Sequence, residues 1–347
     1  MVRKPCRVLV TGAGSGVGQG IFKALRISEL PVTIVSADIS IMNAALYRTD
    51  ESILIPRVES EGALDQIVEL ICFHKIDVVM IGSEFDLEFF SAHKEYIERL
   101  TGVLVIVSPL ETVMIANDKW LTAEFLRQNH LPYAEVHLPQ GHAEAERIAN
   151  EWGYPVVLKT RQGTSSKHVH IINNRAELLE CYASTPLPMI QRVIDIPSPQ
   201  LSCEYTCSVF KTEGGAMIGP FAARRTIRGG TSWLIEVAQF NELHAPLLEI
   251  ADKLDFIGSL NVQLMLTTKG AIPFELNARF SGTTAVRAHY GFNEPAMALR
   301  SFFYREEIPA PELRAGVAMR YHEEVFIENV SANSLLPNHK GVVNSWF

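Results

Sequence analysis

A hairpin pattern in the last third of the chain restricts the fold more than any other feature of the sequence. Two runs with β character flank a tight turn: Leu260–Thr267, Ala271–Leu276 and the turn Thr268–Gly270. Four polar side chains stand in or just after these strands: Gln263, Glu275, Asn277 and Arg279. The last three follow one another at a spacing of two, and in an extended chain such residues share a face. The pattern predicts a hairpin with a polar row on one face.

That polar row has the chemistry of a magnesium and phosphate site. A carboxylate and two amide oxygens, those of Gln263, Glu275 and Asn277, are hard ligands that Mg²⁺ takes when water and nucleotide phosphate complete its shell. Arg279, on the same face, has the N–H groups to hold a phosphate oxygen. For Glu275 taken alone, a solvated surface carboxylate is the competing interpretation.

Composition and charge limit the classes of function. With 347 residues, the chain is long enough for two or three cores, and 47% hydrophobic with 20% charged residues is ordinary for a globular enzyme. The net charge of −8 gives no basic field for nucleic acid. Neither a signal peptide nor an apolar run of about 20 residues is evident, so no membrane association is expected. Five cysteines without a CxxC pair predict free thiols in a reducing cytoplasm.

The N-terminal segment has the pattern of an anion site. A strand, Arg7–Val10, leads through the glycine-rich run Thr11–Gly20 into a helix expected over Ile21–Ile27. The next strand, Pro31–Ala37, ends at Asp38, where dinucleotide-binding folds hold a ribose. Taken alone, this opening resembles a short-chain dehydrogenase. No tyrosine has a lysine four residues on, however, and that family needs the pair.

Strands and helices continue to alternate up to about Glu111, which predicts a compact α/β unit. The remaining elements expected there are the strands 53–55, 77–81 and 103–107 and the helices 64–74 and 87–100. Ser83–Asp86 follows a strand at the carboxyl edge, where such sheets bind ligands. Glu84 and Asp86 are therefore candidate substrate contacts, with capping of the next helix as the alternative.

The middle of the chain carries two lysines in distinct settings. Lys119 follows Asp118 at the start of a helix expected over 119–128. N-capping of this helix would explain Asp118 without any further function. Lys159 ends a buried-type strand, Pro155–Lys159. The small-residue run from Gly163 to Val169 would let backbone N–H groups approach phosphate, with a surface turn as the alternative.

Further strands and a basic segment follow. Strands are expected over 189–194 and from Glu204 to Val209, and an amphipathic helix over 242–254. Arginine is suited to the bidentate capture of carboxylate or phosphate, and three arginines flank a Gly-Gly turn: Arg224, Arg225 and Arg228. A solvated basic face is the alternative for this segment. After the hairpin, Phe280–Arg287 is a small-residue turn.

Taken in order, these features resemble the ATP-grasp superfamily, specifically the branch with the large subunit of carbamoyl phosphate synthase and related carboxylate–amine ligases. The features that agree are Asp118-Lys119, Pro155–Lys159, the loop at Gly163, Gln191, Glu204, and Gln263 with Glu275-x-Asn277-x-Arg279. The resemblance covers about residues 5 to 325. It implies α/β and α+β architecture: a Rossmann-like domain (1–112), then a two-lobed ATP-grasp domain with a small lobe (113–188) and a large lobe (189–330). Residues 331–347 have no assigned role.

The resemblance also implies a role for individual residues. The nucleotide set is Lys119, Lys159, Gly163, Thr164, Ser165, Ser166, Gln191, Val193 and Glu204. The magnesium set is Gln263, Glu275 and Asn277, while Arg279, Arg224, Arg225 and Arg228 serve the phosphates and reacting groups. The acceptor set is Glu84, Asp86, Ser281, Gly282, Thr283 and Arg287. Two departures stand out, since Glu is more usual at Gln191 and the loop at Thr164–His168 usually contains more glycine.

The implied activity is ATP-dependent ligation with Mg²⁺. In such enzymes the γ-phosphoryl group moves to a carboxylate, and an amine or other nucleophile attacks the acyl phosphate and releases phosphate, with ADP as the other product. The implied partners are a small-molecule carboxylate and an amine. A homodimer stays open, because dimers are common among similar enzymes. Two alternatives remain: a nucleotide-binding or phosphoryl-transfer protein without ligation, and a nicotinamide-dependent oxidoreductase using the Gly12–Gly20 loop.

Overall fold

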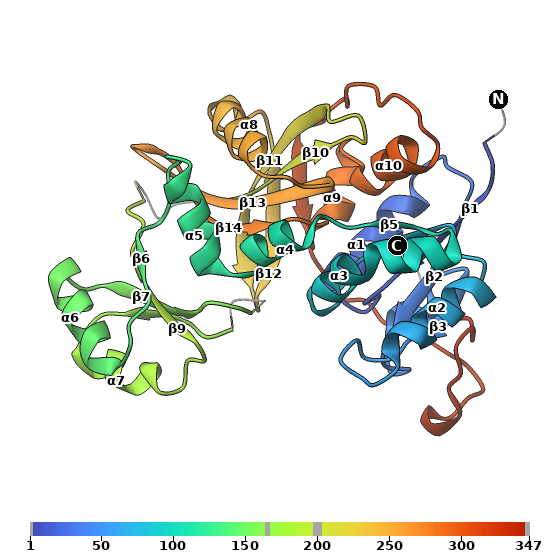
Figure 1. The fold of residues 1–347 in the computed structure, drawn as a ribbon, viewed down its shortest axis with the longest axis horizontal. Helices are drawn as coiled ribbons and strands as arrows, with labels where there is room; N and C mark the ends of the chain where they lie inside the picture. The colour runs from blue at the N-terminus through green and yellow to red at the C-terminus, as the bar shows by residue number, and fades with distance from the viewer. Residues whose placement is uncertain (1–2, 164–166, 197–202, 344–347) are drawn as a thin grey trace.

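The computed structural model describes residues 3–163, 167–196 and 203–343, and this part of the chain forms three β-sheets (Figure 1). The Thr164, Ser165 and Ser166 positions lie outside the described residues. Within those ranges, no helix combines the length and the apolar character that a membrane crossing requires.

The N-terminal domain is a parallel five-stranded sheet in the order β3-β2-β1-β4-β5. Its strands are β1 (Cys6–Val10), β2 (Val32–Asp38), β3 (Glu51–Leu54), β4 (Val78–Met80) and β5 (Leu104–Ile106). Its helical elements are α1 (Gly16–Arg26), η1 (Ala44–Tyr47), α2 (Ala63–Phe73) and α3 (Glu84–Thr101). The expected Rossmann-like fold is confirmed.

Helix α1 begins five residues earlier than expected. The Ser15 side chain accepts hydrogen bonds from the N–H groups of Val17 and Gly18, so it caps a helix whose first turns are glycine-rich. The missing side chain of Gly20 lets α1 approach the Ser281 carbonyl, since an added Cβ would lie 3.2 Å from that oxygen. This close approach sets the N-terminus of α1 beside the loop that precedes α9 (Thr284–His289).

The small lobe is a four-stranded sheet in the order β6-β9-β7-β8 (Figure 1, left). Its elements are β6 (Val136–His137), α6 (His142–Trp152), β7 (Val156–Thr160), β8 (Val169–Ile172), α7 (Arg175–Tyr182) and β9 (Pro188–Arg192). Alternate side chains of β7 and β8 pack against α6 and α7, among them Val156, Leu158 and Ile172. The remaining side chains of these strands therefore face the opposite side. Helices α4 (Leu110–Asn117) and α5 (Lys119–Gln128) connect this lobe to the N-terminal domain.

The large lobe is a six-stranded antiparallel sheet in the order β14-β13-β10-β11-β12-β15. Its strands are β10 (Glu204–Lys211), β11 (Met217–Arg228), β12 (Thr231–Val237), β13 (Gly258–Thr267), β14 (Gly270–Asn277) and β15 (Gly316–Met319). The helical elements are η2 (Asn241–Leu243), α8 (His244–Lys253), α9, α10 (Glu294–Ala298), the π-helical η3 (Leu299–Phe303) and η4 (Ala332–Ser334). The predicted hairpin is β13–β14, and together with the small lobe this sheet confirms the expected ATP-grasp architecture.

Two sheet faces of the large lobe differ in chemistry. Apolar side chains of β10 and β13, such as Cys207, Val209 and Val262, pack under α8 and α5. Polar side chains of the same strands occupy the other face. The helix expected over 242–254 is divided into η2 and α8, and Pro246 lies in the first turn of α8, where its missing N–H costs no helical hydrogen bond.

The C-terminal segment returns to the N-terminal domain (Figure 1). The N–H of Gly341 donates to the Tyr47 carbonyl at 2.9 Å, and the Asn338 backbone and side chain bond to Ser52. Lys340 donates to the carbonyls of Thr49 and Asp50. The described part of the stretch that the sequence left unassigned thus ties the end of the large lobe to the first domain.

Candidate functional site

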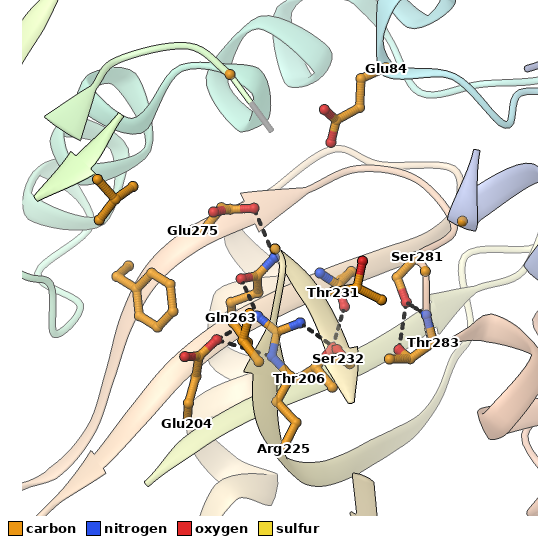
Figure 2. Close-up of a pocket in the computed structure, with 18 of the residues that line it drawn as sticks. Glu84, Glu204, Thr206, Arg225, Thr231, Ser232, Gln263, Glu275, Ser281 and Thr283 are labelled. Atoms are coloured by element: carbon orange, nitrogen blue, oxygen red, sulfur yellow. Dashed lines mark hydrogen bonds and ion pairs between the residues drawn. The ribbon is translucent and has the colours of Figure 1, made fainter. Parts of the chain in front are cut away.

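A pocket of about 480 Å³ lies where the N-terminal domain and the two lobes meet. Figure 2 shows Glu84 on one side of it and Glu204, Arg225, Gln263 and Glu275 on the opposite side. The pocket therefore receives side chains from all three sheets or the loops beside them.

The small-lobe wall follows from the alternation of strands β7, β8 and β9. Val157 and Lys159 point to the pocket from β7, Ile171 points there from β8 and Gln191 from β9. Lys159 is 5% exposed, and no carboxylate of the described residues forms an ion pair with it. Burial, and secondarily the charge of Lys119, lower the pKa of Lys159 to about 7, partly offset by Glu275. The wall thus presents a buried cation in an apolar frame.

The start of α5 positions the second lysine. Asp118 accepts from the N–H groups of Trp120 and Leu121 and forms an ion pair with Arg161, so the capping interpretation of Asp118 is confirmed. Lys119 lines the pocket and its Nζ donates to the Gly163 carbonyl at 3.0 Å. The three loop residues after Gly163 lie outside the described residues.

The β9 strand of the small-lobe wall carries an acceptor without a donor among the described residues. Gln191 is 6% exposed, lines the pocket, and its Oε1 accepts no hydrogen bond from the part of the chain that the structure describes. Val193 is expected to contribute backbone groups, and this stays a prediction; its side chain is 38% exposed and does not line the pocket, whereas Ile194 does. The chain leaves β9 at Arg192, so the strict strand alternation no longer applies.

The large-lobe floor is organised around Arg225. Its guanidinium donates to the Glu204 carboxylate, to Gln263 Oε1 at 2.6 Å and to Ser232 Oγ at 3.0 Å. Glu204 and Gln263 lie on the neighbouring strands β10 and β13. Their side chains reach the same guanidinium, so one arginine fixes three strands of the floor.

The magnesium donor set is only partly available in this arrangement. Glu275 Oε1 accepts from Gln263 Nε2 at 2.8 Å and from Asn277 Nδ2 at 3.1 Å. Glu275 Oε2 and Asn277 Oδ1 accept no hydrogen bond within the described ranges, and both are hard oxygen donors of the kind Mg²⁺ takes. Gln263 differs, because its Oε1 already accepts from the Arg225 cation. The residues fit a magnesium ion held by Glu275 and Asn277 with water and phosphate oxygens.

The acceptor end of the pocket brings the N-terminal domain to the large lobe. Glu84, in the first turn of α3, forms an ion pair with Arg279 across the domain boundary. Burial, together with the nearby charge of Arg287, lowers the pKa of Arg279 to about 10, and its buried Nε has no described partner. Ser281, Gly282 and Thr283 line this end of the pocket, with the Ser281 and Thr283 hydroxyls 2.7 Å apart.

Six predicted site residues within the described ranges do not line the pocket: Val193, Arg224, Arg228, Asp86, Arg287 and Asn277, the last of which lies beside it and donates to Glu275. Arg224 points to the opposite face of β11 and pairs with Glu236, and Arg228 lies over the Trp233 ring, 4.8 Å from its centroid. Asp86 lies in the first turn of α3 with its side chain buried, and this burial raises the pKa of its carboxyl to about 6. Arg287 is fully buried in an ion pair with Glu294. Arg224, Arg228 and Arg287 thus have partners or packing contacts away from the pocket, which neither the turn residues nor the resemblance indicated.

Several pocket residues were missed by the sequence analysis. Thr206 and Asn261 each lie two residues from a predicted site residue on the same strand, so the period of two could have indicated them. Arg320 lies just after β15, in a segment without a motif that would have indicated a site residue. It donates to the carbonyls of Ser232 and Gly282 and so connects two edges of the pocket.

In the N-terminal domain, Asp38 and Asn43 occupy the space beside the glycine-rich loop. Asp38 Oδ2 accepts from the Gly14 N–H and from Asn43 Nδ2, and an added Cβ on Gly14 would lie 1.8 Å from that same Asn43 nitrogen. The acid that a dinucleotide ribose would need is engaged, and Asn43 occupies the space beside the loop. This arrangement counts against the nicotinamide alternative.

Comparisons with known proteins agree with this architecture. The family model of a PylC-like N-terminal domain matches residues 8–106, and the model of an ATP-grasp domain matches residues 116–283. The multifunctional protein ura1 of Schizosaccharomyces pombe is 21% identical over 304 residues, which cover 81% of this chain, and URA2 of Saccharomyces cerevisiae is similar to the same degree. The chain spans only 13% of the length of each of these two proteins.

Solved structures share the fold over most of the chain. N5-carboxyaminoimidazole synthetase from Staphylococcus aureus, complexed with ADP, has a TM-score of 0.71 at 16% identity and covers 91% of this chain and 82% of its own. The biotin carboxylase domain of Hydrogenobacter thermophilus 2-oxoglutarate carboxylase, with MgADP, has a TM-score of 0.71 at 15% identity, with coverage of 98% and 83%.

The chain therefore carries an ATP-grasp domain that follows a PylC-like N-terminal domain. This confirms the resemblance drawn from the motifs. Members of the family are typically ATP-dependent ligases or carboxylases.

Proposed function

We propose that this protein is an ATP-dependent ligase that forms an acyl phosphate from a small-molecule carboxylate and passes the acyl group to an amine. One observation carries the proposal: Lys159 is buried and has no ion pair among the described residues, and it faces a floor where Glu275 Oε2 and, beside the pocket, Asn277 Oδ1 accept no hydrogen bond from those residues. A polyanion bound with a divalent cation would satisfy both walls together. Nucleoside triphosphate with Mg²⁺ has that combination of charges.

The small-lobe residues would bind the nucleotide. Lys119 and Lys159 are placed to neutralise phosphate oxygens, and Gln191 Oε1 can accept from the exocyclic amine of adenine. Val157, Ile171 and Ile194 give this part of the pocket apolar surface for the base. Magnesium, held by Glu275 and Asn277, supplies neutralisation of the phosphate charge.

The acceptor end would position the carboxylate. Arg279 lies between the floor and Glu84, so it can hold an oxygen of the transferred phosphoryl group or of the acceptor. The loop Ser281–Thr283 offers hydroxyl groups beside the N-terminus of α1. Phosphoryl transfer needs little covalent work from the protein, so positioning and charge neutralisation suffice, and no side chain has to act as a nucleophile.

The test is magnesium-dependent ADP release against a panel of carboxylic acids, each with and without amines. Product analysis separates ADP from AMP. We expect ADP and phosphate with one acid and amine, and loss of both in Glu275→Ala. The matched control is Glu236→Ala, which removes a carboxylate from the same sheet but outside the pocket. Release of AMP would overturn the acyl-phosphate mechanism, and a wild-type protein that binds no magnesium nucleotide would overturn the whole proposal.

A further inference from the structure

A buried ionic network lies directly beneath the pocket floor. Arg287 of α9 and Glu294 of α10 are both fully buried, and Arg287 Nη1 lies 3.2 Å from Glu294 Oε2. The Glu294 carboxylate also accepts from the hydroxyls of Ser208 and Ser259. Neither charged group lines the pocket. The network therefore acts on the pocket only through the residues that it contacts.

On its pocket side, the network holds one oxygen of Asn261. Asn261 Oδ1 accepts from Arg287 Nη2 and, at 3.0 Å, from Thr206 Oγ1. Arg287 Nη2 also donates to that Thr206 hydroxyl at 3.0 Å. Because a guanidinium can only donate, the carboxamide must present its oxygen to Arg287 and turn its nitrogen the other way.

The turned nitrogen of Asn261 faces the pocket without an acceptor among the described residues. Asn261 is 2% exposed and lines the pocket, and its Nδ2 donates to no acceptor among the residues that the structure describes. The nitrogen opens on the pocket, so a ligand oxygen bound there is its natural acceptor. A negatively charged oxygen or a carbonyl oxygen of a ligand would accept a hydrogen bond at this point.

Gln263, two residues along the same strand, shows the contrast. Its Oε1 accepts from Arg225 and its Nε2 donates to Glu275, so both ends of this amide are used within the floor. Asn261 lies opposite Asn277 in the β13–β14 register, about 7 Å beyond Gln263 along the strand. This position is on the acceptor side of Glu275, where the terminal phosphoryl group of a bound triphosphate would reach.

We propose that Asn261 donates from Nδ2 to the terminal phosphoryl group of the triphosphate, and that Arg287 is the positioning residue that fixes this orientation. The inference rests on the proposed nucleotide-binding function. A donor aimed where negative charge is transferred stabilises that charge without reorganisation. An oxygen at the same place would repel it.

Orienting the Asn261 amide gives the buried Arg287–Glu294 ion pair a function beyond stability. Replacing a buried ion pair by apolar groups is often neutral for stability, so such a pair is weak support for a purely stabilising purpose. A cation below Asn261 does what an apolar residue cannot, since it selects one of the two orientations of the amide. Glu294 then balances the charge of Arg287 in the interior.

The experiment is a calorimetric titration of the full chain with MgADP and with the magnesium complex of a β,γ-imido triphosphate analogue. The measured quantity is the ratio of the two dissociation constants, which reports contacts to the terminal phosphoryl group. Asn261→Asp keeps the shape and the oxygen held by Arg287 but removes the donor. We expect the preference for the triphosphate to fall by about tenfold or more, while the MgADP affinity changes by less than about threefold.

Positioning by Arg287 is tested with the double variant Arg287→Met/Glu294→Met, which removes both buried charges together. It should show the same loss of triphosphate preference as Asn261→Asp. Thr206→Val, which deletes the hydroxyl that holds Asn261 Oδ1, gives a second measurement should the double variant not fold, with an expected loss of about threefold. Ser259→Ala is the control, because it alters the network at Glu294 without touching Asn261.

The outcomes separate the two proposals. A wild-type chain that binds neither ligand overturns the proposed function and this inference with it. Normal MgADP binding with an unchanged ratio in Asn261→Asp overturns the donor role alone. An unchanged ratio in the double variant overturns the positioning role of Arg287, and an unchanged ratio in Thr206→Val overturns the part of the Thr206 hydroxyl in holding Asn261 Oδ1.

Discussion

The two walls of the pocket differ in whether their buried cations have ion-pair partners. On the large lobe, Arg225 pairs with Glu204, and beneath it Arg287 pairs with Glu294. On the small lobe, Lys159 has no ion pair among the described residues, and Lys119 donates to a backbone carbonyl. The cations of the floor are thus balanced by ion pairs, whereas the small-lobe wall has a buried amine without a counter-charge among the described residues.

This difference indicates a division of labour. A cation that is already paired contributes to folding and holds neighbouring groups in place, but has little charge left for a ligand. A buried cation without a partner is destabilising until an anion arrives. The large lobe is therefore expected to provide geometry, and the small lobe to provide affinity that depends on phosphate.

Removing Arg225 should have the largest effect on folding. Arg225→Met leaves the nearly buried Glu204 carboxylate without its guanidinium, and we expect the free energy of unfolding to fall by about 3 kcal/mol. Urea denaturation measures it. Arg224→Met is the neighbouring control, because its pair with Glu236 is more exposed and should contribute less than about 1 kcal/mol. An equal loss of unfolding free energy in the two variants would contradict the idea that the Arg225 ion pair stabilises the fold more than the exposed Arg224 pair does.

Lys159→Met should affect ligand affinity strongly and the stability of the fold little. The free energy of unfolding should stay within about 1 kcal/mol of the wild type or rise, because an unpaired buried cation is removed. Affinity for the magnesium complex of the triphosphate analogue should fall by about a hundredfold, the scale of a lost charge-assisted hydrogen bond. Titration calorimetry measures this. Lys211→Met, on an ion pair outside the pocket, serves as control, and a Lys159 variant with unchanged affinity would contradict the comparison.

The lowered pKa of Lys159 predicts proton uptake on nucleotide binding. With a pKa of about 7 in the free protein, the amine is mostly neutral at pH 8 and mostly charged at pH 6. Bound phosphate favours the charged form and raises the pKa, so binding should take up about 0.9 proton at pH 8 and only about 0.1 at pH 6. Calorimetry in buffers of different ionisation enthalpy measures the uptake. It should vanish in Lys159→Met, and equal uptake at both pH values would rule out Lys159 as its source.

The sequence predicted those parts of the molecule that depend on local rules. The β13–β14 hairpin, the strand carrying Lys159 and the Asp118 cap follow from periodicity, turn residues and capping, all of which act within a few residues. The motif order then indicated which strands would meet at one pocket. Glu275, Lys159, Lys119 and Gln191 are indeed brought together there.

The sequence could not show which side of a strand or helix would have internal partners. Arg224 and Arg225 are adjacent, yet only Arg225 faces the pocket, because alternation places them on opposite faces and the register decides which face is which. Arg287 was expected at the acceptor, but Glu294, seven residues on, holds it in the interior. Arg320 reaches the rim from a segment whose path depends on the whole fold.

The smallest effect should come from Gln191, the one side chain of the small-lobe wall expected to read the base. Gln191→Leu removes the free Oε1 acceptor but keeps the side chain's bulk, so only the hydrogen bond to the adenine amine is lost. A neutral hydrogen bond contributes about 1 kcal/mol, so ATP affinity should fall about fivefold. Affinity for ITP, which lacks the amine, should change little, and the preference for ATP over ITP should therefore shrink by the same factor. The comparison of the two nucleotides in both proteins isolates this contact from any change in folding. A variant that lost affinity for both equally would show that Gln191 supports the wall and does not read the base.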